Sequence, residues 1–151
     1  MIMYKDKAKS ILRDTIKSAI YIDDNAREFY ADITNGNDIF EEQLSLDLFN
    51  NFKKKGISLD IHKFKLGDEN NCELINYFTD NRDLVLLDWK LNAHSGEKES
   101  LTLLNKVVNS NHIHFCAIYI SDDGQELENI LLNILTFFSG KTRIEYEDIR
   151  E

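Results

Sequence analysis

Four stretches of the chain have the apolar pattern of β-strands. Residues 19–22, 84–87 and 115–120 are continuously apolar, which is typical of strands covered on both faces in a parallel sheet. Ile57, Leu59 and Ile61 alternate with more polar neighbours, which predicts an edge strand with one exposed face. We therefore expect a mostly parallel sheet whose inner strands are the continuous runs.

Apolar residues at helical spacing precede and separate these strands. Residues 5–17 have an amphipathic pattern and predict a helix ahead of the first strand. Apolar residues then repeat every four positions from Phe40 to Phe52 and stop before Gly56, which predicts a crossover helix with a C-terminal cap. Strands that alternate with helices predict an α/β fold: a doubly wound, mostly parallel sheet of about five strands, with an extra N-terminal helix in residues 1–17. Further helices are expected over residues 72–79, 101–108 and 125–138.

The segment between the first strand and the crossover helix is longer than a compact crossover needs. Residues 25–39 contain the turn signal Asn35-Gly36-Asn37, and we interpret them as an insertion. No repeat, low-complexity tract or linker divides the chain, which predicts a single domain over residues 1–151. Residues 141–151 are too few for both a fifth strand and a full helix, so either the fold ends irregularly or the chain is excised from a longer protein.

Composition and charge argue against several classes of function. The chain is 42% hydrophobic and carries a net charge of −9, so we expect no direct contact with nucleic acid, which requires a basic surface. No apolar run approaches the roughly 18 residues of a membrane span, and the N-terminus lacks a signal-peptide pattern, which predicts a cytoplasmic protein without a membrane partner. Cys72 and Cys116, the second of them in a predicted core strand, are isolated, and we expect both to be reduced thiols.

Acidic and hydroxyl residues directly follow the apolar runs. Asp23 and Asp24 close the first run, Asp88 closes the second, and Ser121 follows the third. Open α/β sheets bind ligands at the carboxyl ends of their strands, so we expect these side chains to meet at one edge. Three carboxylates repel one another unless a cation lies between them, and hard oxygen ligands suit Mg²⁺. The pattern predicts a metal-dependent phosphate site, although Ser121 is also suited to cap the next helix.

The acidic pair, the Asp-x-Lys-Leu sequence that begins at Asp88, and the hydroxyl residue after the next apolar run resemble the receiver domain of bacterial response regulators, the CheY-like fold. The resemblance covers roughly residues 18–141 and implies the strand order 2-1-3-4-5. It also implies that Mg²⁺ is held by Asp24, Asp88 and the backbone carbonyl of Lys90, with Asp23 helping through water.

The same resemblance implies the phosphoryl chemistry. Asp88 takes the role of phosphoacceptor, and Ser121 that of the hydroxyl residue that contacts the phosphoryl group. Lys141 is the candidate for the lysine that ends the fifth strand in this family. The proline that usually follows that lysine is absent, because the chain contains no proline.

Together these features predict a receiver domain of a two-component phosphorelay, in which phosphorylation of Asp88 switches protein contacts. The expected cofactor is Mg²⁺. The expected partners are a histidine kinase or phosphotransfer protein and an output domain or partner protein, with a homodimer as a further option. We expect no separate enzymatic activity beyond Mg²⁺-dependent self-phosphorylation and dephosphorylation. The alternative is a pseudo-receiver, a protein-interaction module that has the fold without phosphoryl transfer.

Overall fold

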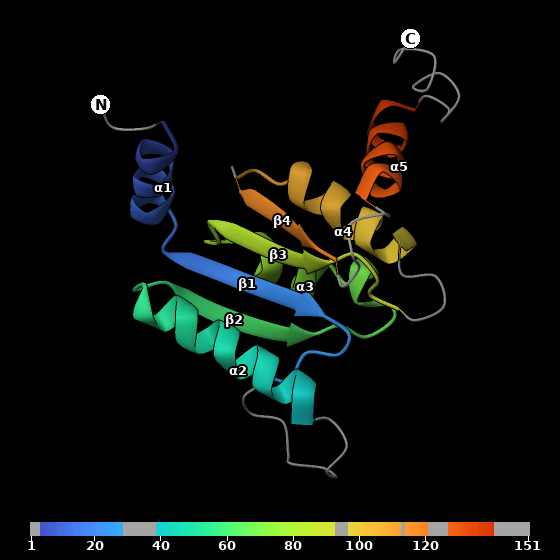
Figure 1. Cartoon of the computed structure of the whole chain (residues 1–151). Coiled ribbons are helices and arrows are strands. Elements are labelled where there is room, and N and C mark those ends of the chain that lie inside the picture. Colours follow the sequence, from blue (N-terminus) through green and yellow to red (C-terminus); the bar gives the residue numbers. More distant parts are fainter. Residues whose placement is uncertain (1–3, 29–38, 93–96, 113, 121–126, 141–151) are drawn as a thin grey trace. The chain divides into compact units, whose positions relative to one another are not determined.

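The helices and strands follow the pattern expected from the sequence. The computed structural model describes residues 4–28, 39–92, 97–112, 114–120 and 127–140 (Figure 1). The strands are β1 (Ser18–Asp23), β2 (Ser58–Lys63), β3 (Leu84–Asp88) and β4 (Phe115–Tyr119). The helices are α1 (Tyr4–Thr15), α2 (Ile39–Lys54), α3 (Cys72–Thr79), α4 (Glu97–Val108) and α5 (Leu127–Ser139), and a short 3₁₀ turn, η1, spans Asp68–Asn70.

The strands form one parallel sheet in the order β2-β1-β3-β4. The α/β class and the parallel sheet are therefore confirmed, and β2 lies at an edge, as its alternating pattern predicts. This order coincides with the first four places of the order 2-1-3-4-5. Among the residues that the structure describes there is no fifth strand, so the fifth strand stays a prediction.

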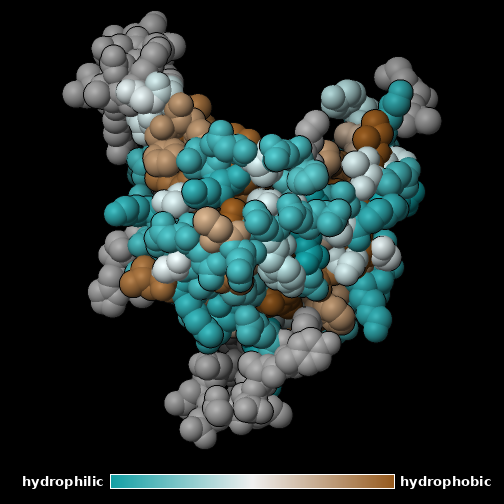
Figure 2. Space-filling model, turned by 180° about the vertical axis from the view of Figure 1, so that it is seen from behind, coloured by the Kyte–Doolittle hydropathy of each residue, from teal (hydrophilic) through white to brown (hydrophobic). Residues whose placement is uncertain are grey.

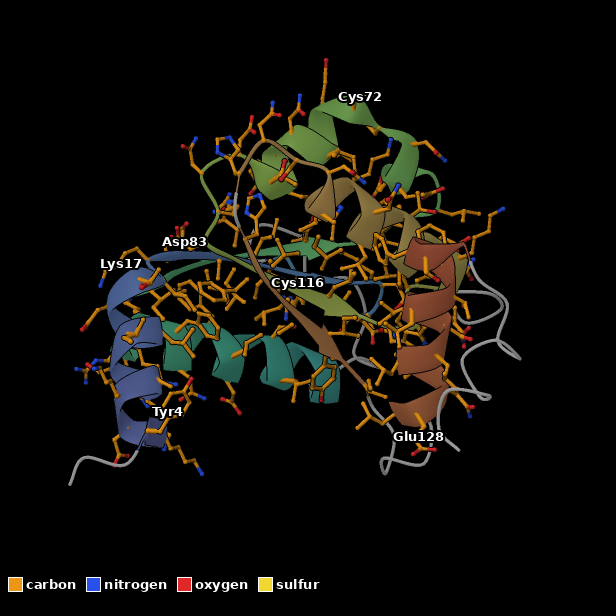
Figure 3. All side chains as sticks on the ribbon, turned by 90° about the horizontal axis from the view of Figure 1, so that it is seen from above. Tyr4, Lys17, Cys72, Asp83, Cys116 and Glu128 are labelled. Carbon is orange, nitrogen blue, oxygen red and sulfur yellow. The ribbon has the colours of Figure 1, made fainter. Side chains whose placement is uncertain are left out.

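Helices cover both faces of the sheet. α2 lies against one face, whereas α3 and α4 lie against the other (Figures 1 and 3). Alternate residues of β1 point to opposite faces. Ala19 and Tyr21 pack with Leu59 and with apolar residues of α2, while Ile20 and Ile22 point to the opposite face. All four of these β1 side chains are at most 4% exposed, which explains why this strand is apolar at consecutive positions.

β4 is more exposed than its apolar sequence predicts. Cys116, which the sequence suggests is in the core, is exposed, and Phe115 and Tyr119 are also exposed. The reason is its place in the sheet: among the described residues β4 is the last strand, so a neighbouring strand shields it on one side only. Cys72 and Cys116 are both free, in agreement with the expected unpaired thiols.

α1 leaves the sheet where β1 begins, and none of its residues is buried (Figure 1). Its base is fixed by Asp83, whose carboxylate accepts hydrogen bonds from the backbone N–H groups of Lys17 at 2.8 Å and Ser18 at 2.9 Å. Figure 3 shows Lys17 and Asp83 side by side at this junction. These hydrogen bonds, that of Lys17 above all, lower the pKa of Asp83. The junction is thus held in place although the helix itself does not pack on the sheet.

The chain divides into two units, Met1–Tyr119 and Ile120–Glu151. The first contains α1 to β4, and the second contains α5. The single-domain interpretation stays a prediction, and most of the expected insertion at residues 25–39 lies outside the described residues. No helix in the described ranges is long and apolar enough to cross a membrane. The face seen in Figure 2 is mostly hydrophilic, in keeping with a chain in which 30% of the residues are charged.

Candidate functional site

Strand register places Asp23 beside Asp88. β1 pairs with β3 so that Ile22 is opposite Leu87, and the next residue of each strand is an aspartate. Asp24 follows as the chain leaves β1. One carboxylate oxygen from each of the three aspartates lies within 4.8 Å of the others. The structure therefore brings together the three acidic residues that the sequence singles out, at the carboxyl end of the parallel sheet.

Asp23 is the most enclosed of the three, with 9% of its surface exposed. The hydroxyl of Tyr21 donates a hydrogen bond to one of its carboxylate oxygens, and the backbone N–H of Asn25 donates to the other at 2.6 Å. Tyr21 reaches Asp23 because residues two apart in a strand share a face. The side-chain amide of Asn25 also donates to Asp24 at 3.0 Å. These donors orient the acidic pair and offset part of the cost of burying Asp23.

The backbone at Asp88 is tied to the elements on either side. Beyond β3, the N–H of Trp89 donates to the carbonyl of Tyr119 at 2.9 Å, which extends the ladder with β4 by one hydrogen bond. The hydroxyl of Ser100, in the first turn of α4, donates to the carbonyls of Asp88 at 3.0 Å and of Trp89 at 2.8 Å. Ser100 and Trp89 are both fully buried. A displacement of the backbone at Asp88 would therefore disturb its hydrogen bonds with both β4 and α4.

Burial and mutual repulsion disfavour full ionisation of the cluster. Burial, followed by the charge of Asp23, raises the pKa of Asp88 from its ordinary value of 3.8 to about 6. Backbone hydrogen bonds from Lys90 and Trp89 lower this pKa but are outweighed. The pKa of Asp24 is also raised, by burial and by the charge of Asp23. The carboxylates thus form an anionic cluster whose repulsion a bound cation would relieve.

The donor set fits Mg²⁺, which is commonly bound by one or two carboxylates together with waters and phosphate oxygens. Both oxygens of Asp23 already accept hydrogen bonds from the protein. Asp24 and Asp88 are therefore the better candidates for direct ligation, and Asp23 for contact through water. This distribution agrees with the roles that the sequence resemblance implies, but the roles themselves stay predictions.

Of the remaining predicted site residues, the structure describes Lys90 but not Ser121 or Lys141. Lys90 is exposed, and its position two residues after Asp88 is the one that the expected carbonyl ligand requires. Ser121 and Lys141 lie outside the described residues. The acceptor, hydroxyl and lysine roles of Asp88, Ser121 and Lys141 therefore belong to the proposal below.

Sequence reasoning missed three residues around the acidic cluster. Tyr21 holds Asp23, Ser100 holds the backbone of Asp88, and Tyr119 is the residue of β4 that pairs with Asp88. Burial, the hydrogen bond to Asp23 and the charges of Asp23 and Asp88 raise the pKa of Tyr21, so its hydroxyl remains a hydrogen-bond donor. The spacing of two residues between Tyr21 and Asp23 was a usable signal, whereas a serine at a helix start is too common to be one.

Comparison with known proteins agrees with this geometry. The family model for the response receiver domain matches residues 15–151, a range that includes all three aspartates and every strand of the sheet. No curated protein and no solved structure matches the chain. The chain therefore belongs to the response receiver domain family.

Proposed function

We propose that this receiver domain is a phosphoacceptor of a two-component phosphorelay, in which Asp88 takes up a phosphoryl group in the presence of Mg²⁺. The observation that carries the proposal is the convergence of three carboxylates, within 4.8 Å of one another, at the carboxyl end of a parallel sheet. Receiver domains generally bind Mg²⁺ at an acidic pocket and act in signalling. Such a pocket repels an incoming phosphoryl group unless a divalent cation offsets the charge, so metal and acceptor belong to one site.

Each acidic residue has a distinct role in this proposal. Asp24, Asp88 and the backbone carbonyl of Lys90 would hold Mg²⁺, and Asp23 would act through water. When bound, Mg²⁺ would neutralise charge on the acceptor carboxylate and on the phosphoryl oxygens. Asp23 is held by Tyr21 and by the N–H of Asn25, and therefore keeps the cluster in shape.

The reaction is an in-line displacement at phosphorus. A carboxylate oxygen of Asp88 attacks the phosphorus of a phosphohistidine on a histidine kinase or phosphotransfer protein. The new O–P bond forms as the P–N bond breaks, the departing imidazole takes up a proton, and Asp88 becomes an acyl phosphate. In our proposal the Ser121 hydroxyl and the Lys141 amine contact the phosphoryl oxygens, as the family pattern implies.

Phosphorylation adds charge and bulk to the side chain of Asp88. The backbone at this residue is hydrogen-bonded to two neighbouring elements. The hydrogen bonds from Ser100 to the Asp88 carbonyl and from Trp89 to Tyr119 connect that position with α4 and β4. We propose that these links pass the change to a surface that an output domain or partner protein contacts.

One observation favours the pseudo-receiver as a second candidate. Asp23 and Asp24 accept hydrogen bonds from Tyr21 and Asn25, so the protein itself stabilises the acidic pair. Protonation of Asp88 removes part of the repulsion, and its pKa of about 6 allows this protonation below about pH 6. A cluster of this kind can persist in a binding module that never takes up phosphate.

Binding of beryllofluoride separates the two candidates, because this tetrahedral anion mimics a phosphoryl group on an aspartate. For the phosphoacceptor we expect a bound signal in ¹⁹F NMR that requires Mg²⁺ and disappears in Asp88→Asn. Asp83→Asn is the matched control, because Asp83 directly precedes the first residue of β3 and Asp88 is its last. This substitution should leave the signal unchanged. A folded wild-type chain without a bound signal would favour the pseudo-receiver.

A further inference from the structure

α1 carries a mostly apolar stripe whose large side chains are exposed in the described part of the chain. Tyr4 is 90% exposed and Ile11 is 55% exposed, and no residue of α1 is buried. Tyr4, Ala8, Ile11 and Thr15 follow one another at intervals of four, three and four residues, which is the spacing of a coiled-coil seam. Figure 3 shows α1, with Tyr4 labelled, standing beside the sheet and not upon it. The helix is therefore available to pair with another helix.

Charged residues beside the seam indicate which helix fits. Lys7 and Asp14 lie on the same flank of the seam, two turns apart. If two copies of α1 pair in an antiparallel arrangement, this flank of one copy lies against the same flank of the other. Lys7 of each copy then lies beside Asp14 of the other. On the second flank Lys5 lies beside Leu12, whose exposed surface the lysine stem can cover. The helix is therefore complementary to itself in the antiparallel direction.

The same charges disfavour other arrangements. A parallel pair brings the lysines at positions 5, 7 and 9 of both copies together at one end and leaves Lys7 without an acidic partner at the seam. An anionic lipid surface fits the basic helix but not the rest of the chain, because α1 has four basic and two acidic residues while the whole chain has a net charge of −9.

We propose that the chain forms an antiparallel homodimer through α1. Asp83 accepts hydrogen bonds from the backbone N–H groups of Lys17 and Ser18 and so holds the base of the helix, and no residue of α1 is buried. Two helices of 12 residues bury less than the roughly 1,200 Å² of a standard protein interface, so the dimer is weak, with a dissociation constant in the micromolar range or above. This assembly is independent of the acidic cluster.

The test is a concentration series of the full chain by sedimentation velocity, with charge reversals on α1. We expect Lys7→Glu and Asp14→Lys each to weaken dimerisation about tenfold, because each replaces two attractive contacts by two repulsive ones. The double variant Lys7→Glu/Asp14→Lys should dimerise as the wild type does. An equimolar mixture of the two single variants should form the heterodimer, since each then supplies the charge that the other lacks.

Controls separate this pairing from general effects of charge. Asp6→Lys reverses a charge on the face of α1 opposite the seam and should leave dimerisation unchanged, whereas Ile11→Asn should reduce it. Both positions are exposed, so neither change removes a core contact, and circular dichroism verifies the fold. A wild-type chain that stays monomeric at about 1 mM overturns the proposal, whether or not it binds anionic vesicles. A dimer that neither single reversal weakens, or that the double variant does not restore, also overturns it.

Discussion

Asp88→Asn is expected to make the protein more stable at neutral pH when no divalent metal is present. Burial and the charge of Asp23 raise the pKa of Asp88 from 3.8 to about 6, so its ionised form is disfavoured in the folded state. Asparagine has nearly the same shape, carries no charge, and can still accept backbone hydrogen bonds through its one side-chain oxygen. Because Asp88 is partly exposed and solvent screens the repulsion, we expect a gain of about 2 kcal/mol in the free energy of unfolding at pH 8, measured by urea titration.

The dependence on pH has a definite sign. A carboxyl group with a raised pKa contributes stability that is fully present below its unfolded value, near 3.8, and is lost as the pH rises through about 6. The advantage of Asp88→Asn should therefore be absent near pH 3.5, grow between pH 4 and 6, and level off above pH 7. Asp6→Asn, at an exposed carboxylate on α1, should change stability by less than about 0.5 kcal/mol. An Asp88→Asn variant that is less stable than wild type at pH 8 would contradict the proposed repulsion.

Mg²⁺ is expected to stabilise the wild-type protein by relieving the same repulsion. At about a hundredfold excess over its dissociation constant, a ligand that binds only the folded state adds about 2.7 kcal/mol to the free energy of unfolding. In Asp88→Asn the gain at the same Mg²⁺ concentration should be much smaller, because one ligand and most of the repulsion are gone. The two changes are therefore non-additive, and thermal unfolding with and without Mg²⁺ measures their coupling.

Two controls locate the Mg²⁺ effect at the acidic cluster. Asp83→Asn removes a carboxylate from the opposite end of the sheet and should retain the full gain, although its baseline stability is lower because the hydrogen bonds to Lys17 and Ser18 are weakened. A monovalent salt at equal ionic strength should give little gain. Equal stabilisation of wild type and Asp88→Asn by Mg²⁺ would mean that the cation binds elsewhere.

The position of the acidic cluster could be predicted because it depends on two features that are visible along the chain. A strand buried on both faces must be apolar throughout, so its end is marked by the first charged residue, here Asp23 and Asp88. Parallel strands bring such ends to one edge of the sheet. The helices were predictable for a similar reason, since α2 must bury one face and therefore repeats apolar residues at helical spacing from Phe40 to Phe52.

Features that depend on which side chains meet in the folded chain, or on the position of a strand within the sheet, were not predictable. Tyr21 lies inside an apolar run, and its spacing of two residues from Asp23 indicates a shared face but not that its hydroxyl donates a hydrogen bond to Asp23. The run at β4 is as apolar as that at β1, yet only β1 is covered from both sides, because burial depends on where topology places a strand. Ser100 acts on the Asp88 backbone from a helix that begins nine residues later in the chain, a link that no local pattern encodes.

The mass of the intact protein after incubation with Mg²⁺ and acetyl phosphate tests the phosphoacceptor proposal most directly. We expect an increment of one phosphoryl group in the wild-type chain and in Asp83→Asn, and none in Asp88→Asn or without Mg²⁺. The increment should disappear in alkali, because an acyl phosphate hydrolyses readily. A folded wild-type chain that gains no phosphoryl group from this donor and binds no beryllofluoride would contradict the phosphoacceptor, as would a phosphoryl group that persists in Asp88→Asn.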